Sequence, residues 1–148
     1  MRTIVTFHSS AFNTAESKPY FINPGCFGDD LARWLRARFR EAGVTTDEEP
    51  GQEDFGWYLN FAVPEGPHTC VVGLRPGEAD RAPEWVLWIE RTHGLMGSMF
   101  GGRRRGIAPS AIALLHRVLS NAPDVAALRW HERHDFDAGR DETASAVP

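Results

Sequence analysis

The strongest constraint on the fold is a run of alternating residues between positions 55 and 63. Every second position in this run is apolar, and the apolar set is Phe55, Trp57, Leu59, Phe61 and Val63. Side chains of a β-strand point alternately to its two faces, so a period of two predicts a strand with one face on a hydrophobic core. Such a strand needs partner strands and a layer that covers its apolar face.

Four further segments predict the partner strands. Residues 3–8 are rich in β-branched and aromatic types, and residues 68–75 follow the turn sequence 64–67. A strand at 84–91 carries apolar residues on both faces, which is typical of a central position in a sheet. The last strand is expected at 125–130.

Two helices are predicted between these strands. Residues 29–42 carry apolar side chains at helical spacing and end before Gly43, which suits the left-handed conformation after a helix. Residues 109–120 begin with a proline, which the first turn tolerates. The expected fold class is α+β, a two-layer sandwich with a mainly antiparallel sheet. Its order is β-α-β-β-β-α-β, with both helices on one face.

The length of 148 residues predicts one domain. We expect residues 1–134 to form that domain and residues 135–148 to be a disordered, charged tail. The chain opens into a strand without the apolar segment of a secretion signal, and no run is long enough to cross a bilayer. With only two cysteines, these features favour a cytoplasmic protein with reduced thiols and no membrane partner.

The most suggestive segment for chemistry is the Gly-rich, basic stretch 94–106. Glycine lets backbone N–H groups approach an anion, and arginine supplies fork-shaped donors ahead of a helix start. The predicted anion-binding residues are Gly101, Gly102, Arg103, Arg104 and Arg105. Arginines replace the Lys and Ser/Thr of a P-loop, so that pattern is incomplete. The alternative is a surface loop whose arginines serve solubility.

Two surface features are candidates for contact with a partner. Arg33, Arg36 and Arg40 share one face of the first helix, although an ordinary solvated face is an alternative interpretation. Trp85 and Trp88 are three positions apart in a strand and therefore point to opposite faces. Trp88 is predicted to mark a partner surface on the face that the helices leave bare.

The sequence holds no complete catalytic pattern. Cys26 precedes a helix start, which can activate a thiol, but His8, His68 or His93 could act as its base only if the fold brings one near. The histidines at 131 and 134 lack the HExxH context of a zinc site. We therefore predict no catalytic residue, no metal and no cofactor.

Three segments resemble a family of small bacterial proteins with no assigned activity: Phe21 to Asp30, Glu49 to Tyr58, and Phe100 to Ile107. The resemblance would extend over nearly the whole chain and implies a single bacterial domain, without a mechanism. The sequence Glu-Asp-Phe-Gly-Trp at the strand start is also similar to that of some bacterial immunity proteins, an analogy at the level of fold.

These observations favour a non-catalytic intracellular binding module for a protein or an anionic partner. The alternative is an enzyme acting on a phosphorylated or carboxylated small molecule, with residues 94–106 as the anion clamp and Cys26 or a histidine in the chemical step. A third, weaker hypothesis is nucleic-acid binding through the arginines, which the net charge of −4 disfavours. The oligomeric state stays open.

Overall fold

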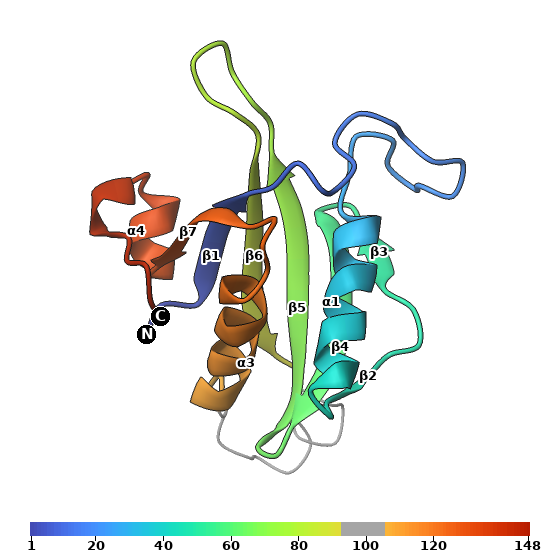
Figure 1. Ribbon diagram of the computed structural model, residues 1–148, viewed down its shortest axis with the longest axis vertical. Helices are drawn as coiled ribbons and strands as arrows, with labels where there is room; N and C mark the ends of the chain where they lie inside the picture. The colour runs from blue at the N-terminus through green and yellow to red at the C-terminus, as the bar shows by residue number, and fades with distance from the viewer. Residues whose placement is uncertain (93–105) are drawn as a thin grey trace.

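The computed structural model describes residues 1–92 and 106–148 (Figure 1). Its elements in chain order are β1 (Ile4–His8), α1 (Asp29–Glu41), β2 (Thr45–Thr46), β3 (Gly51–Glu53), β4 (Gly56–Val63), β5 (Gly66–Arg75), β6 (Glu84–Arg91), α3 (Pro109–Ser120), β7 (Ala126–His131), α4 (Arg133–Asp137) and the 3-10 turn η1 (Asp141–Thr143). The strand pairs are antiparallel, which confirms the predicted α+β class with a mainly antiparallel sheet. None of the helices described is long and apolar enough to cross a membrane.

The strands form one sheet in the order β2-β4-β5-β6-β1-β7, and β3 pairs with the same edge of β4 as β2. Strands β4, β5 and β6 make a meander, while β1 lies between β6 and β7. Strand β4 begins at Gly56, one residue later than the apolar pattern that starts at Phe55. Phe55 itself lies in the turn before β4 and is 57% exposed. The short elements β2, β3 and α4 add to the predicted order.

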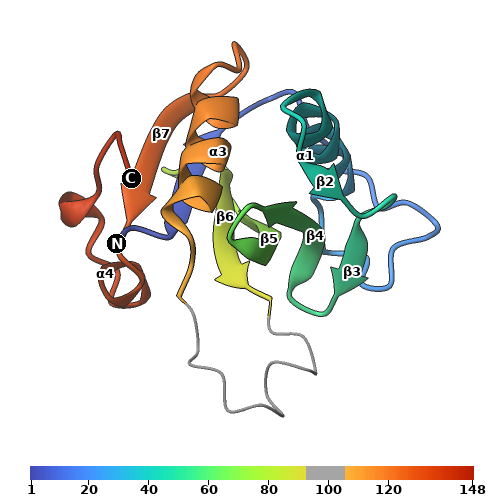
Figure 2. The same cartoon turned by 90° about the horizontal axis from the view of Figure 1, so that it is seen from below.

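Helices α1 and α3 lie on the same face of the sheet (Figures 1 and 2). The strand register aligns one row of side chains across this face: Trp57, Val72, Leu87, Val5 and Trp130. All five belong to the hydrophobic core, as does Trp85. Trp88 points to the other face of the sheet and is only half-buried. The prediction that Trp85 and Trp88 lie on opposite faces is therefore confirmed.

The close approach of α1 to the sheet depends on Gly28, which precedes the helix with φ 132°. A Cβ at this position would lie 2.9 Å from Cγ1 of Val72. Only glycine combines this backbone conformation with the space available. The start of α1 is therefore held directly against the centre of the sheet.

The C-terminal residues fold onto the sheet instead of forming the expected disordered tail. The ring of Phe136 packs edge-on against His131, with centroids 5.3 Å apart. Further on, the backbone N–H of Ser145 donates to the carbonyl of Trp130 at 2.9 Å. The charged composition of residues 135–148 concealed these two contacts, because both depend on the tertiary position of β7.

Candidate binding groove between the two main helices

The predicted anion-binding residues Gly101, Gly102, Arg103, Arg104 and Arg105 lie outside the described residues. The segment follows strand β6 and precedes helix α3. Since β6 runs antiparallel to β1, its last residue, Arg91, lies at the end of the sheet opposite His8. Cys26 lies near the start of α1, where its carbonyl accepts a hydrogen bond from the indole of Trp57. The fold therefore keeps His8 and Cys26 away from the point where this segment begins.

The arginines of α1 contact the chain's own acidic turn. Arg33 Nε and Arg36 Nη1 lie 3.5 and 3.2 Å from the carboxylate of Glu49. Arg40 Nε donates to Thr46 Oγ1 at 2.7 Å. The three side chains thus fasten the segment after α1 to the helix. These donor atoms are engaged within the molecule, which leaves fewer of them for a partner than the sequence suggested.

Trp88 lies on the second face of the sheet, away from α1 and α3. Its indole N–H donates to Glu90 Oε1 at 2.8 Å, and its six-membered ring lies beside Gly73. This position is compatible with the predicted partner surface. Its role there stays a prediction.

No hydrogen bond joins Cys26 to a histidine within the described ranges. The thiol of Cys26 lies 3.5 Å from the carbonyl of Asp54. His8 uses Nδ1 to contact the carbonyl of Pro83 at 2.9 Å. Among the described residues there is also no group of three metal-ligating side chains. Among the described residues, Cys26 therefore has no histidine as a base, and His93, the third candidate base, lies outside these residues.

His68 has a structural role that the sequence did not reveal. Its side chain is fully buried, with Nδ1 3.0 Å from the carbonyl of Gly66. The backbone N–H of Ala108, the residue before α3, donates to Nε2 at 3.0 Å. Nδ1 must therefore carry the proton, and the ring is neutral. Burial lowers the pKa of His68, which favours this neutral form.

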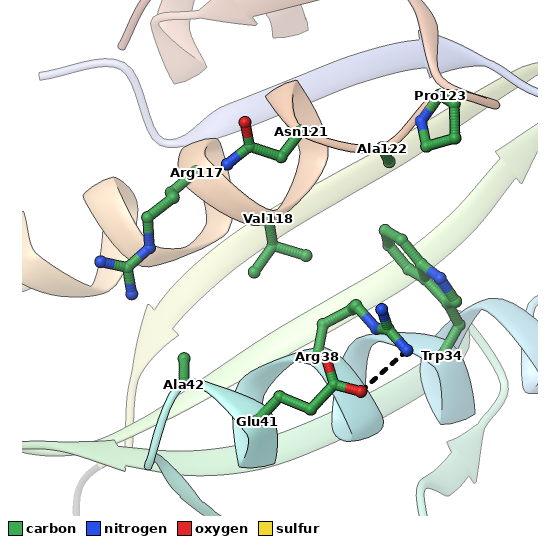
Figure 3. A pocket seen from close by; sticks show the side chains of 9 residues that line it. All are labelled: Trp34, Arg38, Glu41, Ala42, Arg117, Val118, Asn121, Ala122 and Pro123. Carbon is green, nitrogen blue, oxygen red and sulfur yellow. Dashed lines mark ion pairs between the residues drawn. The ribbon is translucent and has the colours of Figure 1, made fainter.

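A groove of about 540 Å³ lies between α1 and α3 (Figure 3). One face of each helix lines it, together with the residues that follow each helix. The lining residues are Trp34, Arg38, Glu41, Ala42, Arg117, Val118, Asn121, Ala122 and Pro123. Residues three and four positions apart lie on the same face of a helix, which explains the spacing of the lining residues in both helices.

The centre of the groove is apolar. Trp34 and Val118 are half-buried and pack against the hydrophobic core, and Figure 3 shows both side chains directed into the space between the helices. Phe12 supports Trp34 from behind, with an edge-on contact at 5.7 Å between ring centroids. This packing holds the indole in place without a ligand.

The rim of the groove carries an excess of positive charge. Arg38 Nη2 forms an ion pair with Glu41 Oε1 at 2.9 Å. Arg117 is exposed and has no ion pair in the part of the chain that the structure describes. Two guanidinium groups and one carboxylate leave a formal charge of +1 around an apolar centre. The arrangement can therefore attract a carboxylate and pack an apolar group beside it.

A second hollow of about 430 Å³ lies where β1 ends. It combines His8 with the hydroxyl groups of Ser9, Ser10 and Thr14. Ser9 Oγ accepts the backbone N–H of Ala11 at 3.2 Å, and no hydrogen bond connects it to His8 in the described residues. The hollow therefore lacks the contact that would activate a hydroxyl.

Comparisons with protein-family models, with curated proteins and with solved structures find no match to this chain. The similarity of three segments to small bacterial proteins therefore stays an expectation.

Proposed function

We propose that the protein is a non-catalytic binding module that holds an acidic segment of a partner protein in the groove between α1 and α3. One observation carries the proposal: Arg117 stands without an ion pair in the described ranges, at the edge of an apolar centre formed by Trp34 and Val118. A guanidinium group donates two parallel hydrogen bonds to a carboxylate, and Trp34 at the other end of the groove supplies large apolar contact area (Figure 3).

The dimensions favour a peptide over a small metabolite. From Trp34 to Ala42 the wall of α1 extends about 12 Å at 1.5 Å per residue. An extended segment of about four residues spans this length at about 3.3 Å each. Small-molecule sites enclose most of their ligand, whereas this groove lies on the outer surface between two helices (Figure 3).

Arg38 provides a second contact for the same segment. Its ion pair with Glu41 is exposed, and such pairs contribute only about 0–1 kcal/mol. A carboxylate of the partner can therefore replace Glu41 at little cost. Trp34 lies at one end of the groove, Arg117 at the other, and Arg38 between them (Figure 3), so an apolar side chain of the partner would meet Trp34 and two acidic side chains would meet Arg38 and Arg117.

The architecture supports this role in a further way. We infer a two-layer unit in which α1 and α3 form the outer layer, so that a partner reaches the groove without disturbing the sheet. We also infer a cytoplasmic location, with the enzyme hypothesis set aside because the described residues offer no paired nucleophile and base.

The test uses two blocked hexapeptides, one with alternating Glu and Leu and one with alternating Lys and Leu. In NMR titrations at low salt we expect the acidic peptide to shift the signals of Trp34 and of α3, with a Kd in the millimolar range or below. Arg117→Ala should weaken its binding about tenfold, which corresponds to about 1.4 kcal/mol.

Arg81→Ala is the matched control, because Arg81 is exposed and lies in the β5–β6 connection away from the groove. This variant should bind the acidic peptide as the unchanged protein does. Equal binding of the acidic and the basic peptide would contradict the proposal, and so would an Arg117→Ala variant with unchanged affinity.

A further inference from the structure

The C-terminal residues 132–148, here called the strap, cover a polar part of the sheet. The strap contains α4 and η1, and no residue of either element is buried. Beneath it lies the second face of the sheet, away from the groove. There, His131 and Thr6 are 2% and 1% exposed.

His131 lacks a hydrogen-bond partner on one side. Its Nε2 lies 2.9 Å from Thr6 Oγ1, which ties β7 to β1. Its Nδ1 is buried and has no partner in the described part of the molecule. An imidazole nitrogen in this position gains hydrogen bonds to water as soon as the cover is removed.

Charged groups of both signs face His131 from the surrounding elements. Asp141 of η1 and Glu84 of β6 favour the imidazolium, while Arg129 of β7 and Arg75 of β5 oppose it. The element α4 contributes the uncharged ring of Phe136, over which the guanidinium of Arg75 lies at 4.9 Å. Burial is the largest influence, and it lowers the pKa of His131.

The strap itself is attached by few contacts. Phe136 packs on His131, and Trp130 exchanges two backbone hydrogen bonds with Ser145. Glu132 forms an exposed ion pair with the amino group of Met1 at 3.1 Å. An element with no buried side chain and few anchors opens more readily than the core strands.

We propose that the strap opens when His131 takes up a proton, uncovering the second face beside β1 and the outer edge of β7. A proton on Nδ1 would place a charge in a buried site that has no acceptor for it, next to Arg75 and Arg129. Opening lets water reach the ring and relieves that cost. Acid therefore favours the open form, because the open form binds the proton more readily than the closed one.

The test is amide hydrogen exchange of the full chain, measured by NMR between pH 8 and pH 5 and corrected for the intrinsic exchange rate. The amide of Ser145, which donates to Trp130, reports on the strap, while amides of β4 and β5 report on global unfolding. We expect the opening of the strap to increase by up to roughly thirtyfold at pH 5, the ceiling for an open-state pKa of about 6.5.

Three variants separate the proposal from a general effect of acid. His131→Asn should abolish the increase, whereas His134→Asn, which changes an exposed histidine of α4, should leave it intact. Asp141→Asn removes a carboxylate that favours protonated His131 in the closed form, so it should enlarge the increase. This last variant keeps His131 and tests the idea even where His131→Asn does not fold. Opening that is independent of pH, or that keeps its pH dependence in His131→Asn, would overturn the proposal.

Discussion

Replacing His68 by phenylalanine tests how the fold holds the start of α3. Phenylalanine is close to histidine in size and stays next to Phe61, whose ring centroid lies 5.9 Å from that of His68. The substitution removes the acceptor for the N–H of Ala108 and the donor for the carbonyl of Gly66. Packing is thus largely kept while both hydrogen bonds are lost.

The expected loss follows from the burial of the two partners. Ala108 is only 5% exposed, so its N–H would stay buried without an acceptor, which costs about 1–3 kcal/mol. Gly66 is partly exposed, and water can satisfy much of its carbonyl. Together we expect His68→Phe to lower the free energy of unfolding by about 2–4 kcal/mol, a large fraction of the about 5–15 kcal/mol of an ordinary domain.

Urea denaturation at pH 7.5 measures this loss. His68→Gln is the matched variant, because a glutamine amide oxygen can accept the N–H of Ala108 in place of Nε2. It should recover part of the stability. A loss below about 0.5 kcal/mol for His68→Phe, or a glutamine variant no better than phenylalanine, would refute the anchoring role.

The same histidine predicts a pH dependence. Burial lowers the pKa of His68, so the unfolded chain takes up a proton at a higher pH than the folded chain. The stability is therefore complete above the ordinary pKa of about 6.5 and falls as the pH decreases below it. His68→Gln should lose less stability than the unchanged protein between pH 7 and pH 5.

Two further predictions concern single residues. Burial raises the pKa of Cys70 to about 12, so in the folded protein a thiol reagent at pH 8 should modify one cysteine, the half-buried Cys26, and both cysteines only in urea; rapid modification of two thiols in the folded state would contradict this. Ala127 has φ 53° at the irregularity between β1 and β7, so Ala127→Gly should stabilise the protein by about 0.5–1 kcal/mol, whereas a clear loss of thermal stability would show that the strain is not there.

Local patterns were sufficient for most of the fold. In a strand, successive side chains point to opposite faces. The alternation over β4 and the opposite orientation of Trp85 and Trp88 therefore follow from local geometry alone. The two short strands β2 and β3 contain too few residues to show a period. They form because β4 offers an edge, which is a property of the assembled sheet.

The candidate groove could not be predicted, because it depends on which helix faces meet. Trp34 and Arg38 are four positions apart, as are Arg117 and Asn121, so each pair signals a shared helix face. Nothing local tells that these two faces adjoin. The sequence also did not show that Arg33 and Arg36, which were predicted to meet a partner, pair with Glu49 instead. Glu49 comes close to these two arginines only because the chain turns back along α1.

The most direct test of the binding account is a reversal of charge in the groove. The dissociation constants of the acidic and the basic hexapeptide would be measured for Arg117→Glu and for the unchanged protein at the same low salt concentration. The account predicts that the unchanged protein prefers the acidic peptide and that Arg117→Glu prefers the basic one. The same preference in both proteins would contradict it.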